Sequence, residues 1–544
     1  MKLFILYLFS LQACVFPQMK VTPGLFSGKD IQKTIEYLGS DSLEGRGTGT
    51  QGEELAAEYI SMKLKSMDIA PFGTGSSYYQ FIPLLGNIPL KSSILIINSG
   101  TEEYQCKLNE DYLMYTAGEQ TFIPNPLPLV FVGYGIVAPE FDYNDYQSVN
   151  VEGKIAVMLS GEPASDDPGF FYGKEETIYS RPDAKQRLAI SRGASGSIII
   201  PYKQNWDNSI WENFRIQFAF ENVQLPYNAA SNFSILFNPV KAGMLFSGSG
   251  YSLEDIYNMQ KNNNMKSFPL KTKLSFNGHF RVREFTSKNI IGMIEGNDPV
   301  LKNSYLIISA HYDHLGIGPS VKGDSVYNGV LDNAMGVAAL LQLSKALKEH
   351  REEFKRSVIF LFLTGEEKGL IGSSFYVDHP VVPLYKTIAD INIDGIAAFD
   401  EFNSIIGIGT EFSSLNKFFK ETAGGMGLSV GKIPGIFDQS DAFYLSDQLS
   451  FALAGIPSMI TMEGIDYKHI SKKEGTERFI NYSEKVYHTP FDDLNQKINF
   501  NASIEHISFL YNLITELLNS EEAPEWNEGT PFINARLRSI AEKK

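Results

Sequence analysis

The chain has 544 residues, of which 43% are hydrophobic and 20% are charged. This balance is typical of a globular protein, and the length suggests more than one domain. The formal net charge of −16 argues against a nucleic-acid partner, because proteins that bind nucleic acids present basic surfaces to the phosphates.

The N-terminus has the features of an export signal. Residues 1–13, MKLFILYLFSLQA, place one lysine before an apolar run that is too short to span a bilayer. We therefore expect a signal peptide or lipoprotein signal over residues 1–18, and a mature protein that is periplasmic, membrane-anchored or extracellular. The sequence Leu11-Gln-Ala-Cys14 also resembles a bacterial lipobox, which would put a lipid on Cys14 and tether the protein to a membrane. Ordinary signal cleavage nearby is the alternative.

The sequence pattern changes from helical to β-like near residue 90. Residues 30–70 carry apolar side chains at helical spacing and end before Pro71. Short β-like runs follow at 93–98, 127–134 and 154–159, separated by turns rich in Pro, Gly and Asp. No cluster of His, Cys or paired acids in this stretch suggests chemistry. We interpret it as a β-rich part that shapes access to a cleft elsewhere.

Three apolar runs in the second half of the chain are typical of buried strands. Each run leads into acidic residues or a histidine: His311 follows 305–310, Glu366 and Glu367 follow 357–363, and Asp394 follows 388–393. In open α/β sheets, ligands bind in the crevice at such strand ends. The pattern therefore predicts a site at this edge of a sheet.

Taken singly, several of these residues also fit ordinary structural roles. Asp332 precedes apolar residues at helical spacing, where a carboxylate is favoured as a helix cap as well as a metal ligand. Glu366 and Glu367 would repel each other unless one meets a cation or is protonated, but they also fit a solvated helical turn. His488 lies in a polar loop before a final amphipathic helix.

Five motifs, in order, resemble those of the di-zinc exopeptidase family of aminopeptidases and glutamate carboxypeptidase-like proteins. They are His311-x-Asp313, Leu331-Asp332-Asn333, Gly365-Glu366-Glu367-x-Gly369-Leu370-x-Gly372-Ser373, Asn392-Ile-Asp394 and Tyr487-His488-Thr489. The resemblance implies an α/β zinc exopeptidase fold, a three-layer mixed sheet flanked by helices, over residues 19–90 and 284–520. Residues 521–544 would be a polar C-terminal tail.

A second resemblance covers the β-like stretch. Residues 129–135, 153–157 and 193–200 resemble segments of a protease-associated (PA) domain. We therefore expect a β-rich PA-like domain, inserted into the peptidase fold over residues 91–283.

The family resemblance also assigns metal ligands for two Zn²⁺ ions. Asp332 would bridge the two ions. His311 and Asp394 would complete one site, and Glu367 and His488 would complete the other. Carboxylate and imidazole groups of this kind suit zinc.

The same resemblance assigns catalytic roles. Glu366 would be the general base, and Asp313 would orient the imidazole of His311. Tyr487 would steady the oxyanion that forms during hydrolysis. The peptide bond from Asp332 to Asn333 would be cis.

Together these features predict an exported zinc metallopeptidase that acts on peptides. The favoured activity is that of an aminopeptidase, with hydrolysis by a hydroxide held between two zinc ions and Glu366 as the base. A glutamate carboxypeptidase-like enzyme is the alternative, and it would need a basic clamp for which Arg192, Arg215, Arg281 and Arg283 are candidates. A one-zinc glutaminyl cyclase and a non-catalytic receptor-like protein are further alternatives. The sequence leaves the oligomeric state open.

Overall fold

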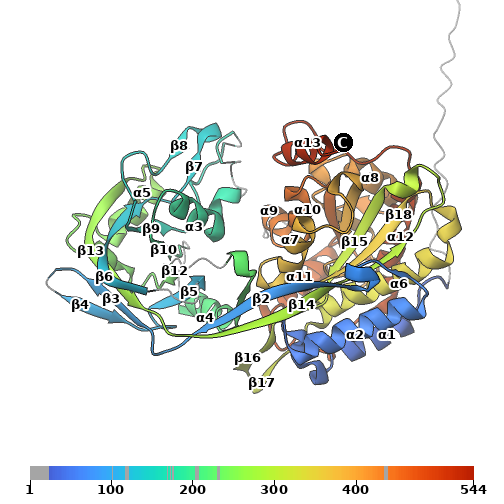
Figure 1. The fold of residues 1–544 in the computed structure, drawn as a ribbon, viewed down its shortest axis with the longest axis horizontal. Coiled ribbons are helices and arrows are strands. Elements are labelled where there is room, and N and C mark those ends of the chain that lie inside the picture. Colours follow the sequence, from blue (N-terminus) through green and yellow to red (C-terminus); the bar gives the residue numbers. More distant parts are fainter. Residues whose placement is uncertain are drawn as a thin grey trace, which may run out of the picture.

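The computed structural model describes residues 24–543 except 101, 117–121, 168, 172, 174–176, 203–207, 229–232 and 434–438. The predicted export signal and Cys14 lie outside the described residues, so export and lipidation stay predictions. Within the described part of the chain, no helix is both long and apolar enough to cross a membrane. Two sheets organise two lobes, which lie side by side in Figure 1.

The larger lobe is built on a mixed sheet with ten strands among the described residues. Their order is β11 (Asn222–Gln224), β2 (Tyr79–Pro89), β14 (Phe280–Ile294), β18 (Ser357–Leu363), β15 (Tyr305–His311), β19 (Thr387–Asn392), β22 (Ser458–Glu463), β20 (Ser404–Ile408) and β21 (Ser429–Val430), with β1 (Ala70–Pro71) paired to β14. The central strands β18, β15, β19 and β22 are parallel, whereas β14 and β20 run antiparallel to their central neighbours.

Helices cover both faces of this sheet because alternate strand residues point to opposite sides. Ile308 of β15 and Phe360 of β18 belong to the core beneath one set of helices, and Ile307 and Ile359 belong to the core on the other face. The first face packs against α1 (Gly28–Leu38), α2 (Gln51–Ser66), α6 (Met335–Glu349), α8 (Leu415–Gly425) and α12 (Phe500–Asn519). The second packs against α7 (Ile371–Asp378) and α10 (Gln448–Leu453). This arrangement confirms the predicted three-layer α/β fold.

The smaller lobe is a separate β-rich unit with its own apolar core. Its sheet has the order β4 (Glu103–Cys106), β3 (Ile94–Asn98), β13 (Ser267–Asn277), β6 (Phe122–Val132), β9 (Ile155–Leu159), β10 (Gly196–Ile200), β12 (Phe233–Phe237) and β5 (Tyr112–Thr116). Helices α3 (Pro182–Ser191), α4 (Asn208–Gln217) and α5 (Leu253–Lys261) belong to the same lobe. A β-rich domain beside the larger fold is thus confirmed, while its assignment to the PA family stays a prediction.

Strands β2 and β14 connect the two lobes. They pair antiparallel over their length, from Tyr79 opposite Ile290 to Pro89 opposite Phe280. Figure 1 shows this ribbon running from the larger lobe into the smaller one. Two hydrogen-bonded strands, rather than a single segment, therefore join the lobes.

Shorter elements complete the described structure. They are the strand pairs β7 (Val137–Ala138) with β8 (Tyr143–Asn144) and β16 (Gly316–Val321) with β17 (Asp324–Tyr327), and helices α9 (Gln439–Tyr444), α11 (Lys472–Lys485) and α13 (Ile533–Ala541). Within the stretch that the sequence suggested as a polar tail, Trp526 and Phe532 are buried and pack against each other. These two aromatic side chains attach the C-terminal segment to the larger lobe.

Candidate metal centre

The predicted ligands gather at the carboxyl ends of the parallel strands in the larger lobe. His311 is the last residue of β15, and Asp394 lies two residues beyond the end of β19. Glu367 lies in the turn that follows β18, and Asp332 lies in the turn that leads into α6. Because β15 lies between β18 and β19, these short connections bring their side chains together.

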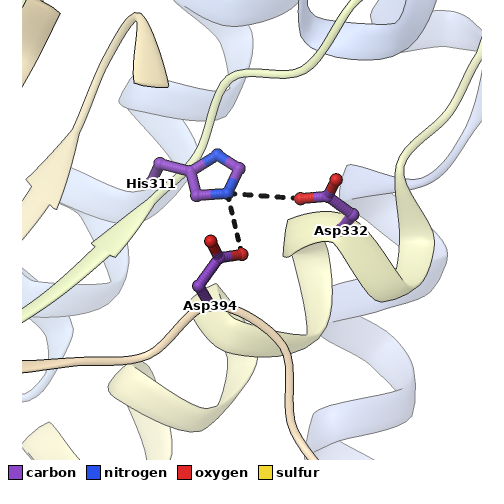
Figure 2. Close-up of side chains that lie close together, drawn as sticks. All are labelled: His311, Asp332 and Asp394. Carbon is purple, nitrogen blue, oxygen red and sulfur yellow. Dashed lines mark hydrogen bonds and ion pairs between the residues drawn. The ribbon is translucent and has the colours of Figure 1, made fainter. Parts of the chain in front are cut away.

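Three of these side chains form a first cluster, which Figure 2 shows. The Nε2 atom of His311 is 3.2 Å from Asp332 Oδ1 and 3.2 Å from Asp394 Oδ1. The His311 side chain is 1% exposed, so this contact is almost completely shielded from solvent. Two carboxylates therefore converge on one buried imidazole nitrogen.

A second cluster uses the other oxygen of Asp332. The Nε2 atom of His488 is 3.1 Å from Asp332 Oδ2 and 3.2 Å from Glu367 Oε2. Burial alone would lower the pKa of His488, but the carboxylates of Glu367 and Asp332 raise it to about 10. The two clusters thus share Asp332, and the second attracts positive charge.

The interatomic spacings fit metal coordination. In a tetrahedral zinc site with bonds of about 2.0–2.1 Å, neighbouring ligand atoms lie about 3.3 Å apart. The four separations of 3.1–3.2 Å in the two clusters match that edge length. Imidazole nitrogens and carboxylate oxygens are also the donors that zinc and similar divalent ions accept. The residues present therefore fit two metal ions that share Asp332.

Arg46 is a buried arginine close enough to these carboxylates for their charges to raise its pKa, but its donors are engaged elsewhere. The side chain is fully buried and donates to the backbone carbonyls of Tyr312, Leu38, Asn328 and Gly329. Its burial lowers its pKa to about 10, although neighbouring carboxylates oppose this effect. Arg46 thus ties the N-terminal segment to the loops of the centre without pairing directly with a ligand.

Glu366 lies next to both clusters without belonging to either of them. Burial raises the pKa of its carboxyl group well above the usual range. The charge of His311 opposes this shift, and the carboxylates of Glu367 and Asp394 add to it. Its backbone N–H donates to Asp313 Oδ1 at 3.2 Å. Glu366 is therefore a half-buried acid whose pKa is shifted by the charges of the centre.

Asp313 is fully buried and makes contacts different from those we expected. Its carboxylate accepts hydrogen bonds from Thr48 Oγ1 at 3.0 Å and from the Glu366 backbone N–H. His311 Nδ1 is 3.8 Å from the carboxylate but 3.3 Å from the Asp313 backbone carbonyl. The nearer acceptor for the His311 ring is thus the main chain, and the carboxylate holds the backbone of Glu366.

Tyr487 lies on the open side of the centre. Its ring stacks on that of His488, with centroids 3.8 Å apart and an angle of 19° between the planes. Tyr487, Asp332 and Asp394 all line one cavity of about 300 Å³. The hydroxyl-bearing side chain is 45% exposed, which leaves it accessible to a molecule in that cavity.

Comparison with known proteins places this domain in a family. Residues 289–513 match the sequence model of Peptidase family M28. The domain that holds the centre belongs to peptidase family M28. The match begins within β14 and ends within α12, so it contains all five predicted ligand positions.

The similar proteins match this chain over only part of their length. The chain is 29% identical over 240 residues to the "probable leucine aminopeptidase 2" of Aspergillus oryzae, which covers 42% of each protein. It is 37% identical over 118 residues to the "Vacuolar membrane protease" of Saccharomyces cerevisiae, covering 22% of this chain and 11% of that one. The chain therefore spans less than half the length of these relatives.

One solved structure shares the fold across both lobes. The aminopeptidase from Aneurinibacillus sp. strain AM-1 superposes with a TM-score of 0.54 at 18% sequence identity. The match covers 91% of this chain and 95% of that chain. The combination of a large α/β lobe and a β-rich lobe thus occurs in another protein.

The M28 domain holds Asp332 in place through a residue that the sequence analysis missed. The buried carboxylate of Asp492 accepts hydrogen bonds from the backbone N–H groups of Leu331, at 2.9 Å, and of Asp332, at 3.0 Å. Asp492 follows His488 by four residues in a polar loop, and nothing in the spacing of that loop distinguishes it from a solvated acid. Folding brings this loop beside residues 331–332, and only this contact gives Asp492 its role.

Asn333 connects the two halves of the first cluster. The Asp332–Asn333 peptide bond is cis, which confirms that expectation. The Asn333 side chain donates to the Ile393 carbonyl at 2.8 Å and accepts from Gly395 N at 2.9 Å. These bonds hold both neighbours of Asp394, so the segments that carry Asp332 and Asp394 are hydrogen-bonded to each other.

Ser446 is a second residue that the sequence analysis missed. Its hydroxyl donates to Asp394 Oδ2 at 2.6 Å, so Oδ1 is the oxygen left facing His311. A single serine among several near residue 446 carries no sequence signal for this contact.

Proposed function

We propose that this protein is a zinc aminopeptidase, which removes residues from the N-termini of peptides. The observation that carries the proposal is the pair of His–carboxylate clusters that share Asp332 beside a free carboxyl group, Glu366. Membership of the domain in peptidase family M28 supports peptide hydrolysis. The name of the Aspergillus relative, a probable leucine aminopeptidase, supports the choice of the N-terminal bond.

His311, Asp332 and Asp394 would hold one Zn²⁺, and Asp332, Glu367 and His488 would hold the second. Bound there, the two ions supply Lewis-acid polarisation of the scissile carbonyl and lower the pKa of water. Glu366 then takes a proton from the attacking water and delivers it to the departing amine. Burial raises the pKa of its carboxyl group, which favours the protonated form between these two steps and opposes the ionised form that the first step needs.

The cavity beside Asp332 and Asp394 is suited to the first side chain of a peptide. Most of its lining is apolar or aromatic, as with Ile396, Phe399, Met462 and Phe479. A volume of about 300 Å³ accommodates a leucine, methionine or phenylalanine side chain. We therefore expect peptides that begin with a large apolar residue to be preferred, because burial of such a side chain contributes about 1.5–3 kcal/mol.

The carboxypeptidase alternative lacks its basic clamp in this cavity. Among the described residues that line it, none is a lysine or an arginine. Arg283 donates to both carboxylate oxygens of Glu221 and to the Gly49 carbonyl, so it is already engaged. Arg215 pairs with Glu212 in the smaller lobe. A substrate carboxylate would therefore find no cation next to Asp394, which favours the aminopeptidase.

The remaining alternatives have less support. A one-zinc cyclase would not need two complete ligand clusters, and a receptor-like protein without catalysis would be expected to have lost ligands. All five ligand positions are intact and converge.

A peptide panel tests the proposal. The zinc-loaded protein is incubated with peptides that have free or blocked N-termini, and Glu366→Gln is the matched control. We expect cleavage that requires a free amine, is fastest after a large apolar first residue, and is lost in the variant. Cleavage of blocked peptides at acidic C-termini would instead establish a carboxypeptidase. No cleavage of either set, with two zinc ions bound, would contradict a peptidase.

Export remains part of the proposal, on the strength of residues 1–18 alone. The mass of the N-terminal peptide of the mature protein, after expression in a bacterium, tests whether the signal is removed or Cys14 is lipidated. A lipid on Cys14 is expected for an anchored protein, and a Cys14→Ala variant would then be released from the membrane fraction. An unprocessed cytoplasmic protein would contradict export.

A further inference from the structure

His314 is a third histidine at the centre to which no role has yet been assigned. It lies three residues after His311 and is completely buried. Its Nδ1 atom is 2.6 Å from Glu367 Oε1, an ion-pair distance, and neither ring nitrogen of His314 nor this oxygen has another polar partner among the described residues. The ring is therefore directed at one oxygen of a predicted metal ligand.

The main chain around His314 fixes the position of its ring. The His314 backbone N–H donates to the Arg46 carbonyl at 3.1 Å, and Arg46 is itself bound to four carbonyls. On the other side, a Cβ atom built on Gly329 would lie 2.5 Å from the His314 ring. The absence of a side chain at Gly329 thus lets the loop close over the imidazole. His314 is held from both sides while it faces Glu367.

The two oxygens of Glu367 have different partners. Oε2 lies 3.2 Å from His488 Nε2, the spacing expected for two ligands of one tetrahedral ion. Oε1 lies 2.6 Å from His314 Nδ1, which is shorter than the separation of such a ligand pair and is a close charge contact between an imidazole and a carboxylate. An ionised carboxylate only accepts, so this contact is attractive when Nδ1 is the ring nitrogen that carries the proton.

We propose that His314 is a positioning residue for Glu367: it binds Oε1 and so keeps Oε2 turned toward the second metal ion. This inference rests on the proposed two-metal site. Without His314, Glu367 would be free to rotate away from the nearby carboxylates of Asp332 and Glu366, which repel it. His314 would then orient a carboxylate ligand, as hydrogen-bonding groups behind metal-bound histidines orient those rings.

Three substitutions at this one position test the inference in the full-length protein. His314→Asn places an amide N–H near the position of Nδ1, whereas His314→Gln places it near Nε2 and His314→Ala removes it. The readout is the affinity for each of two zinc equivalents, measured by chelator competition. The spectrum of the cobalt-substituted protein reports the number of ligands. Thermal unfolding checks that each variant is folded.

We expect the alanine and glutamine variants to bind one of the two metals roughly 10–100-fold more weakly, with the other affinity unchanged. The asparagine variant should recover most of the lost affinity. In every variant that binds two ions, the cobalt spectrum should show an unchanged coordination number. Equal loss in all three variants with a lower coordination number would instead make His314 a ligand. Unchanged zinc affinities in the alanine variant would also overturn the inference. If the alanine variant does not fold, the difference in zinc affinity between the asparagine and glutamine variants tests the inference.

This test is independent of peptide hydrolysis. If the wild-type protein binds two metals but cleaves no peptide, the proposed function fails and the His314 measurement still stands. If the wild-type protein cleaves peptides while the alanine variant keeps both zinc affinities, only the inference about His314 fails.

Discussion

Both lobes place buried polar groups at the carboxyl ends of parallel strands, but they satisfy them in opposite ways. In the smaller lobe, Lys185 donates to the carbonyls of Tyr134 and Gly161, which follow β6 and β9. Asp145 accepts from the backbone N–H groups of Tyr134 and Ile136, both at 3.0 Å. Fixed groups of the protein therefore bind both buried charges.

The larger lobe leaves its charges facing one another. Asp332, Glu367 and Asp394 converge on two imidazoles, and the buried Arg46 nearby uses its donors on carbonyls. A buried charge is costly unless it is paired, and here the carboxylates meet imidazoles, which can either carry a proton or bind a cation from outside the chain. The comparison teaches that the nature of the partners, titratable imidazoles rather than fixed hydrogen-bonding groups, distinguishes a site from a structural network.

The largest expected effect comes from the residue that both clusters share. Replacement of Asp332 by alanine removes one oxygen from each cluster, so we expect both metals to be lost and hydrolysis to become undetectable. Metal analysis after gel filtration measures this result. A variant that retains two zinc ions would show that Asp332 does not bridge and would break the contrast between the lobes.

Glu366→Gln should affect catalysis without affecting the metals. Glutamine keeps the shape of the side chain but cannot take a proton, so we expect turnover to fall roughly 10²–10⁴-fold, the usual contribution of a general base. Steady-state kinetics on a peptide with a free N-terminus, together with zinc analysis, provide the measurement. Near wild-type turnover with full zinc content would remove Glu366 from the mechanism.

Asp145→Ala is the counterpart in the smaller lobe. It leaves the Tyr134 and Ile136 N–H groups and the Tyr143 hydroxyl without their acceptor. Because each buried polar group left unpaired costs about 1–3 kcal/mol, we expect a loss of about 3 kcal/mol in the free energy of unfolding. Denaturant unfolding measures the loss, and zinc content should not change. Loss of metal in this variant would show that the two lobes are not independent.

His506 offers a smaller, pH-dependent test within the larger lobe. Unlike His311, it faces neutral partners: its Nδ1 accepts from Ala397 N, and its Nε2 lies 2.8 Å from Thr461 Oγ1. Burial lowers its pKa to about 3, well below the about 6.5 of an unfolded histidine. Above pH 6.5 both states are neutral, so no stability depends on this group. As the pH falls below 6.5, only the unfolded state binds the proton, and stability is lost.

Between pH 6.5 and pH 5, His506 should therefore cost about 2 kcal/mol of the free energy of unfolding. In a His506→Asn variant, an amide oxygen can accept from Ala397 N but does not titrate. Unfolding of both proteins across this pH range provides the measurement, and the difference between their slopes isolates the histidine. Identical slopes would mean that His506 is solvated or already charged in the folded protein.

The sequence analysis predicted side chains that the fold brings together, because their signal is local. His311 and Asp394 follow apolar runs of β15 and β19, and strand polarity alone brings such ends to one edge. The supporting residues carried no comparable signal. Asp492 and Ser446 come from segments far from the residues they hold, and short polar side chains of their kind occur throughout the chain.

The residue pattern by itself indicated buried strands ending in polar residues and a separate β-rich part, and the resemblance of five motifs to a known family implied the fold class and the residues that meet at the centre. Only the tertiary structure decided how each carboxylate divides its two oxygens: Asp332 between His311 and His488, and Glu367 between His488 and His314. The physical reason is the distance along the sequence between the residues that interact. Strand and helix patterns depend on neighbours along the chain, whereas the rotation of a buried carboxylate depends on groups that folding brings together from distant segments.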